Sequence, residues 1–323
     1  MLPTFTYVSP KTRAELMAQA VTPGAVLHAG GTDLLGCLRD GVFQASKVVS
    51  LNGLKELRGI EPTREGGLRI GALTTLAEIA EHPAIKERYP ALAQGAASAA
   101  SPQLRNQGTL GGNLCQRPRC WYFRGDFHCL RKGGGQCYAA AGQNQYHCIL
   151  GGAGCYIVHP SDTAPALVAL GAQVRIVTRD ASRLMALEAF FVPPSQSIER
   201  ENVLQRGELL YEVLLPPAPA GMRSRYRKAR ARGSFDFALA GVAVAAVVTD
   251  GKVQQVRMVL SGVAPIPWRA TEAEAALVGK PLDADAIGRA AAASVAGAQP
   301  LAHNGYKVHL VQGLVAETLE ALV

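Results

Sequence analysis

The chain has 323 residues, of which 48% are hydrophobic and 18% charged, and its formal net charge is +8. This length and composition predict two or three compact units and exclude an intrinsically disordered chain. The basic residues are dispersed except for one run at 223–232, which argues against a nucleic-acid-binding surface. No segment reaches the roughly 18–20 apolar residues that a membrane span requires.

The first 59 residues predict a small αβ unit. Helices are expected over 12–21 and 34–39, and strands over 25–29 and 47–51. The N-terminus shows no basic segment followed by an apolar one, so no secretory signal is visible. We therefore expect a cytoplasmic protein, or a periplasmic one if a signal-bearing partner carries it across the membrane.

From about residue 60 the pattern changes to a mixture of strands and helices. The predicted strands are 68–72, 173–178 and 208–215, and the predicted helices are 75–81, 89–100 and 163–170. Between them, residues 108–154 are rich in glycine and cysteine and show almost no periodicity. A proline-rich linker at 216–221 is followed by a predicted hairpin (237–248 and 253–261) and three helices (271–278, 285–295 and 306–322). The last part is thus predicted to be an antiparallel sheet packed under helices.

Two glycine-rich loops offer the same chemistry. The first, Leu27-His28-Ala29-Gly30-Gly31-Thr32-Asp33-Leu34, joins a predicted strand to a helix start, and the second is Gly108-Thr109-Leu110-Gly111-Gly112-Asn113. Glycine lets the backbone approach a diphosphate closely, and free N–H groups at a helix start bind its oxygens. Either loop alone could equally be a tight turn. Neither is GxGxxG with a spaced acid, so an NAD site of the Rossmann type is not predicted.

Six of the seven cysteines lie between Cys115 and Cys155. The odd count and the absence of a visible signal disfavour disulfides, and the C-x2-C pairs of zinc ribbons are missing. Four thiolates on a glycine-rich loop can close around a cubane, whose four irons each take one ligand. Spacing alone does not select four ligands from six cysteines.

The two loops, with Ser161-Asp162 after the second and Leu209-Leu210 before Pro216, resemble the FAD-binding subunits of the xanthine dehydrogenase and carbon monoxide dehydrogenase family. The resemblance implies an α+β fold, with a two-subdomain FAD-binding unit of the PCMH/VAO type followed by a CO dehydrogenase flavoprotein C-terminal-like domain. It places the subdomains at 1–59 and 60–218, with an inserted loop at about 114–156, and the last domain at 221–323.

The same resemblance implies a set of FAD-binding residues. The first loop would wrap the diphosphate, the second would form a phosphate and ribose loop, Leu210 would pack near the flavin, and Lys228 would lie close to its ring system. A nearby cation favours the anionic form of a reduced flavin. The implied residues are Leu27, His28, Ala29, Gly30, Gly31, Thr32, Asp33, Leu34, Ser101, Thr109, Gly112, Asn113, Asp162, Leu210 and Lys228.

One branch of this family inserts a loop that binds a [4Fe–4S] cluster between the second glycine turn and the Ser-Asp pair. Matched onto it, the cluster ligands would be Cys120, Cys129, Cys137 and Cys155, whereas Cys115, Cys148 and Cys37 would be packed thiols. This branch includes periplasmic-type aldehyde oxidoreductases and 4-hydroxybenzoyl-CoA reductase. The segments around Gln103–Gln107 and Cys120–Phe123 look closer to the former.

No constellation of nucleophile and base is recognisable, which suits a subunit whose chemistry belongs to its cofactors. The resemblance implies an oxidoreductase subunit that passes electrons from a large molybdopterin-binding subunit and a small [2Fe–2S] subunit to an external acceptor, in a heterotrimer or its dimer. Two other hypotheses stay open: a stand-alone FAD oxidase and a zinc-stapled adaptor without enzymatic activity.

Overall fold

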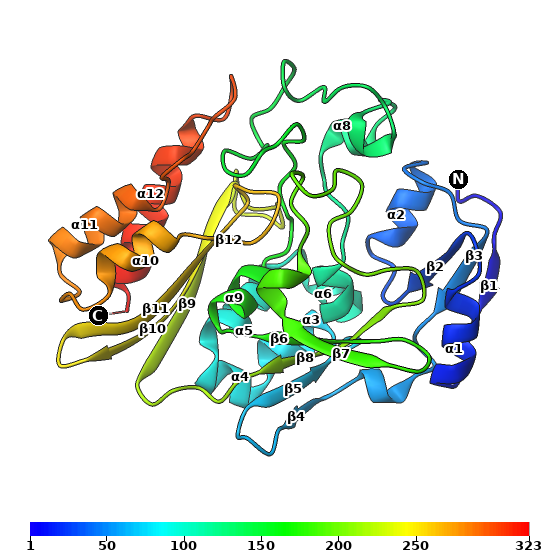
Figure 1. The fold of residues 1–323 in the computed structure, drawn as a ribbon, viewed down its shortest axis with the longest axis horizontal. Helices are drawn as coiled ribbons and strands as arrows, with labels where there is room; N and C mark the ends of the chain where they lie inside the picture. Colours follow the sequence, from blue (N-terminus) through cyan, green and yellow to red (C-terminus); the bar gives the residue numbers. More distant parts are fainter. Residues whose placement is uncertain (323) are drawn as a thin grey trace.

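The computed structural model describes residues 1–322 and contains three sheets (Figure 1). The N-terminal sheet is parallel, with strand order β1-β3-β2. Its elements are β1 (Thr6–Val8), α1 (Arg13–Ala20), β2 (Ala25–His28), α2 (Leu34–Arg39), β3 (Lys47–Ser50) and the 3-10 turn η1 (Lys55–Leu57). Thr12 caps α1 by accepting a hydrogen bond from the Glu15 N–H, and this fixes where the helix begins.

The central sheet is antiparallel, with strand order β4-β5-β8-β6-β7. Short helices cover it, and α3 begins at a capping box formed by Thr75 and Glu78. The strands are β4 (Ile60–Pro62), β5 (Leu68–Gly71), β6 (Gln173–Val177), β7 (Ser182–Ala186) and β8 (Leu209–Leu215). The helical elements are α3 (Leu76–Glu81), α4 (Pro83–Arg88), α5 (Pro90–Ser98), α6 (Pro102–Gln107), α7 (Leu110–Leu114), α9 (Thr163–Ala169) and η3 (Leu187–Phe190).

The C-terminal sheet, with order β12-β11-β10-β9, is buried on both faces. Along β10, Val242, Val244 and Ala246 pack into the C-terminal core, whereas Ala243 and Ala245 pack into the central core. Successive side chains of a strand point to opposite faces, so this continuous apolar run reflects two cores. The elements are β9 (Met222–Ala229), β10 (Ala240–Thr249), β11 (Lys252–Ser261), β12 (Trp268–Arg269), α10 (Thr271–Leu277), α11 (Ala284–Ala293) and α12 (Tyr306–Glu320).

The cysteine-rich segment extends above the central sheet as a long irregular excursion (Figure 1). Its regular structure is limited to α8 (Trp121–Arg124) and the 3-10 turn η2 (Leu130–Lys132). The side chain of Asn304 donates hydrogen bonds to the carbonyl oxygens of His147 and Cys148 at 3.1 and 3.0 Å, which ties the segment to the start of α12.

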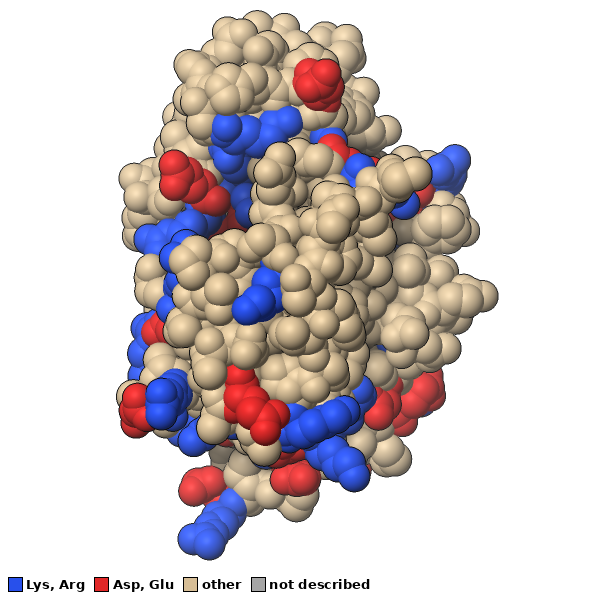
Figure 2. Space-filling view, turned by 90° about the vertical axis from the view of Figure 1, so that its right-hand side faces the viewer, with Lys and Arg blue, Asp and Glu red and all other residues tan. Residues whose placement is uncertain are grey.

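Most predicted elements are present with boundaries shifted by a few residues. Most of the basic run at 223–232 forms strand β9, which was not predicted from the sequence. In this strand, Ser224 and Tyr226 are buried and alternate with arginines. On the N-terminal side of the molecule, Lys and Arg lie beside Asp and Glu along the edges, and much of the centre carries neither (Figure 2). Within residues 1–322, no helix is long and apolar enough to cross a lipid bilayer.

Candidate functional site

The two glycine turns line one open cavity of about 270 Å³ between the N-terminal and central sheets. A Cβ atom at Gly30 would overlap the carbonyl oxygen of Gln107, so the first turn can lie against the second only because residue 30 is glycine. The predicted residues that line the cavity are Leu27, Ala29, Gly30, Gly31, Thr32, Asp33, Leu34, Thr109, Gly112 and Leu210.

The first turn presents free backbone donors. The N–H groups of Gly30, Gly31, Thr32 and Asp33 donate to no acceptor among the described residues. Asp33, the N-cap of α2, does not cap that helix with its side chain. Its carboxylate instead accepts from the Arg117 N–H at 2.7 Å and from the Arg124 guanidinium at 2.7 Å. The donors of this turn therefore remain available for an anionic ligand.

The second turn differs from the first, which corrects the prediction that both offer the same chemistry. Its N–H groups are already used: Leu110 donates to Thr74, Gly111 donates to the Ala72 carbonyl at 2.8 Å, and Gly112 donates to the Thr109 hydroxyl at 3.2 Å. The second turn therefore shapes the wall of the cavity but offers fewer free donors than the first.

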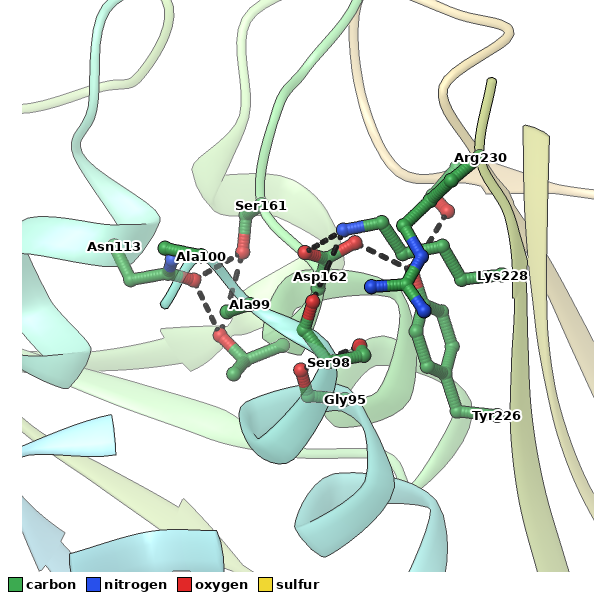
Figure 3. Close-up of polar contacts among 12 residues, drawn as sticks. Gly95, Ser98, Ala99, Ala100, Asn113, Ser161, Asp162, Tyr226, Lys228 and Arg230 are labelled. Atoms are coloured by element: carbon green, nitrogen blue, oxygen red, sulfur yellow. Dashed lines mark hydrogen bonds and ion pairs between the residues drawn. The ribbon is translucent and has the colours of Figure 1, made fainter. Parts of the chain in front are cut away.

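Beyond the second turn, two hydrogen-bonded groups meet residues 161–163: one contains Asn113, and the other contains Asp162 and Lys228 (Figure 3). The side-chain amide oxygen of Asn113 (Oδ1) accepts from the hydroxyls of Ser161 and Thr163 at 2.5 and 2.6 Å. Asp162 lies between Lys228 and Tyr226: its carboxylate accepts from the Lys228 ammonium at 2.8 Å and from the Tyr226 hydroxyl at 2.7 Å (Figure 3).

The Asp162–Lys228 ion pair is almost fully buried, with side chains 5% and 4% exposed. Burial raises the pKa of Asp162, and the Lys228 cation opposes that rise. Burial likewise raises the pKa of Tyr226, assisted by the Asp162 charge. Asp162 thus compensates the positive charge of Lys228. A ligand bound nearby would have to share that charge with Asp162.

Five predicted residues do not line the glycine-turn cavity: Asn113, Asp162 and Lys228, described above, and also Ser101 and His28. The Ser101 hydroxyl caps α6 by accepting from the Leu104 N–H at 3.3 Å, which gives this side chain a structural role. His28 lies behind the first turn, with its ring edge against Tyr7, and burial lowers its pKa. Its Nδ1 atom is buried and has no hydrogen-bond partner.

The four predicted ligands Cys120, Cys129, Cys137 and Cys155 line one small cavity inside the cysteine-rich segment. Among residues 1–322, no three His, Cys, Asp or Glu side chains gather closely enough to hold a single metal ion. Thiols spread around a cavity suit a polynuclear group, in which each iron takes one ligand, better than one zinc ion.

The surroundings of this thiol cavity are apolar and cationic. Burial raises the pKa of Cys120 to about 12, and it raises that of Cys155, against which the Arg131 cation acts. The Cys120 sulfur lies 3.3 Å from the His147 Nε2, and burial lowers the pKa of His147 to about 4. The thiols of Cys120 and Cys155 are thus protonated at neutral pH when no metal is bound, so a metal that binds them would release protons.

The remaining cysteines lie elsewhere. Cys37, on α2, and Cys115, after α7, line the glycine-turn cavity instead. Cys148 is buried within the segment but does not line the cavity of the four predicted ligands, and its N–H donates to the Tyr156 carbonyl. Burial raises the pKa of both Cys115 and Cys148 to about 12.

Sequence reasoning missed Arg117, which lines the glycine-turn cavity and whose guanidinium lies over the rings of Phe43 and Phe123 at 5.8 and 5.0 Å. It also missed Glu201, a buried carboxylate that binds both Arg117 and Arg131. The one available signal in the sequence was the position of Arg117 between the second glycine turn and Cys120, the first of the predicted ligands.

Two family models match the chain. Residues 3–218 match the FAD binding domain in molybdopterin dehydrogenase, and residues 224–322 match the CO dehydrogenase flavoprotein C-terminal domain. Together with the mixed helices and sheets of the structure, these matches confirm the predicted fold class.

Individual relatives are similar over nearly their whole lengths. The aldehyde oxidoreductase FAD-binding subunit PaoB of Escherichia coli is 39% identical over 321 residues, covering 98% of this chain and 97% of that protein. The carbon monoxide dehydrogenase medium chain of Hydrogenophaga pseudoflava is 28% identical, covering 92% and 88%. A structure of carbon monoxide dehydrogenase from the same organism superposes with a TM-score of 0.80 at 27% identity, covering 100% of this chain and 98% of that one.

Proposed function

This chain belongs to the FAD-binding medium subunits of the xanthine dehydrogenase and carbon monoxide dehydrogenase family, and from that membership we propose that it is the electron-transfer subunit of an aldehyde-oxidising molybdenum hydroxylase. Its homologues are FAD-binding oxidoreductase subunits of molybdenum hydroxylase complexes. The 39% identity to an aldehyde oxidoreductase subunit supports an aldehyde as the substrate class. Large molybdopterin-binding and small [2Fe–2S] subunits would supply the electrons, and an external acceptor would remove them.

The observation that carries the proposal is the cavity between the two glycine turns. FAD would lie there with its diphosphate on the free N–H groups of Gly30, Gly31 and Thr32, which suit an anion because no protein acceptor uses them. Asn113 and the Asp162–Lys228 pair would border the flavin. When bound, FAD would exchange one or two electrons, a step that no side chain of this chain supplies.

We further propose that the four thiols of the thiol cavity hold a [4Fe–4S] cluster, which would exchange single electrons. Their common cavity supports this assignment, as does Arg131, a buried cation that lines the same cavity and whose Nε and Nη2 atoms have no hydrogen-bond partner. Iron and acid-labile sulfide in equal amounts would support the cluster, whereas zinc in a colourless preparation would contradict it.

The FAD site can be tested with two alanine variants of nearby glycines. Gly30→Ala should push the first turn away from Gln107 and weaken FAD binding by about tenfold or more, equivalent to about 1.4 kcal/mol. Gly36→Ala is the matched control, because a Cβ atom there meets nothing within 4 Å in the same glycine-turn region. Flavin content and dissociation would be measured in the assembled complex, and equal retention by both variants would contradict this site.

The whole complex distinguishes the proposed function from a stand-alone oxidase. Co-purified with its partner subunits, the chain should become reduced when an aldehyde is added, as followed by flavin absorbance. Purified alone, it should not be reduced by the same aldehyde. Reduction of the isolated chain would favour the oxidase instead.

A further inference from the structure

One buried carboxylate touches the surroundings of both cavities. The Glu201 side chain is 6% exposed; its Oε2 lies 2.9 Å from the Arg117 Nε and its Oε1 lies 2.6 Å from the Arg131 Nη1. Arg117 lines the glycine-turn cavity, and Arg131 lines the thiol cavity. Glu201 therefore stands between two arginines that face different sites.

The position of Glu201 is fixed by its backbone. Its carbonyl accepts from the Val192 N–H at 3.0 Å, and the next residue, Asn202, forms an antiparallel bridge with Phe191. The Arg117 guanidinium also donates to the Glu199 carbonyl at 3.4 Å. The carboxylate is consequently held by the central part of the fold, whereas both arginines belong to the cysteine-rich segment and its approach.

The side chains of Arg117, Glu201 and Arg131 together carry a net positive charge. Two cations share one anion, and among residues 1–322 Glu201 is the sole acidic partner of Arg131. The Arg131 side chain is 1% exposed, and its Nε and Nη2 atoms are buried without a hydrogen-bond partner. Buried donors without acceptors are costly, so the Nε and Nη2 atoms of Arg131 call for an acceptor in addition to Glu201. Thiolates and inorganic sulfide are such acceptors, and they would lie in the thiol cavity that Arg131 lines.

We infer that Glu201 is a positioning residue that joins the two cofactor sites: it holds Arg117 at the glycine-turn cavity and aims the free N–H donors of Arg131 at the sulfur atoms of the cluster. This inference rests on the proposed function. A cation that donates hydrogen bonds to sulfur stabilises the reduced, more negative form of a cluster and so raises its reduction potential.

The test uses the assembled complex and measures the cluster's midpoint potential by EPR-monitored redox titration. Arg131→Gln should lower the potential by an amount equivalent to about a tenfold change in the reduction equilibrium, or about 59 mV for one electron. In the Glu201→Gln background the same substitution should shift the potential by less than half as much, because the guanidinium is no longer held. Glu201→Gln should also weaken FAD binding by about tenfold through Arg117.

The chain supplies a matched control. Glu212 also binds two arginines, Arg69 and Arg175, each at 2.7 Å, and it is 9% exposed, but none of these residues lines either cavity. Glu212→Gln should leave FAD binding and the potential unchanged and should leave the full Arg131→Gln shift intact. If Arg131→Gln loses its cluster, Arg131→Lys, which keeps the charge but not the fork of donors, should retain it with a smaller downward shift.

The outcomes separate this inference from the proposed function. Wild-type complex without iron and labile sulfide would overturn the cluster itself. Wild-type complex with a cluster, combined with an unchanged potential in the Arg131 variants, would overturn the role of Arg131. An Arg131→Gln shift of equal size with and without Glu201 would overturn the positioning role of Glu201.

Discussion

Breaking the buried Asp162–Lys228 pair should destabilise the protein strongly. Both side chains are at least 95% buried and their charged atoms are 2.8 Å apart, so Lys228→Met leaves an uncompensated carboxylate next to the Tyr226 hydroxyl. Removing one partner of such a pair costs about 3–5 kcal/mol, whereas removing both costs much less. We therefore expect a loss of about 3–5 kcal/mol for Lys228→Met, and a coupling of roughly 3 kcal/mol with Asp162→Asn in a double-mutant cycle.

The pH dependence of the Lys228→Met loss follows from the direction of the Asp162 pKa. Burial already raises that pKa above its ordinary value of 3.8, and without Lys228 it must rise further. Between 3.8 and the raised pKa, the folded state binds more protons than the unfolded state, so the free energy of unfolding falls as the pH rises. The difference between wild type and variant should thus be small near pH 3.8 and should grow toward neutrality.

Urea denaturation of wild type, both single variants and the double variant at several pH values measures these quantities. Losses of the two single variants that simply add in the double variant would refute the coupling. A difference between Lys228→Met and wild type that does not vary with pH would refute the assignment of the charge to Asp162.

Three further predictions concern other parts of the chain. Burial lowers the pKa of Lys307 from 10.5 to about 7. Between these pH values the unfolded state binds more protons than the folded state, so the free energy of unfolding should rise with pH. Lys307→Met should flatten this rise, as measured by urea denaturation at several pH values. Thr75→Ala removes the capping box of α3 and should lower the free energy of unfolding by about 1 kcal/mol, as measured by thermal unfolding. Thr271→Ala is the comparison, because it lies at the start of α10, where the N-cap residue Ala270 forms no side-chain cap. Cys155→Ser should lower the iron content of the purified complex, whereas Cys148→Ala should lose stability and keep its iron.

Much of the fold could be predicted because local signals agree with the tertiary structure. Helix α2 begins and ends at the predicted residues, because the first glycine turn directly precedes its short apolar run. Strand β9 escaped prediction because its buried positions, Ser224 and Tyr226, alternate with arginines whose charges hide the period of two. The second face of the C-terminal sheet is buried because it packs against the central part of the fold. The local sequence of β9 does not show this long-range packing.

Some features of the candidate site could likewise be predicted from the sequence, and others could not. The glycine turns could be predicted because backbone geometry restricts their residue types, whereas the four cysteines that line the thiol cavity were selected by the family resemblance. The two turns nevertheless differ in their free N–H groups, because Thr74 and Ala72 from the neighbouring strand end supply acceptors to the second turn alone. Glu201 lies 70 residues from Arg131, and long-range pairing of this kind leaves no trace in a single sequence.

The attachments of the cysteine-rich segment also bear on the order of assembly. Three hydrogen bonds hold the segment to residues far away in the sequence. Asp33 binds Arg124 at a sequence separation of 91 residues, Glu201 binds Arg131 at 70, and Asn304 binds the His147 carbonyl at 157. Each anchor lies in a different part of the chain, and contacts so distant in sequence form late because their loop-closure entropy must first be overcome. We expect the newly made polypeptide to complete its surrounding scaffold before this segment closes, so that any metal bound by the four thiols would enter late in maturation.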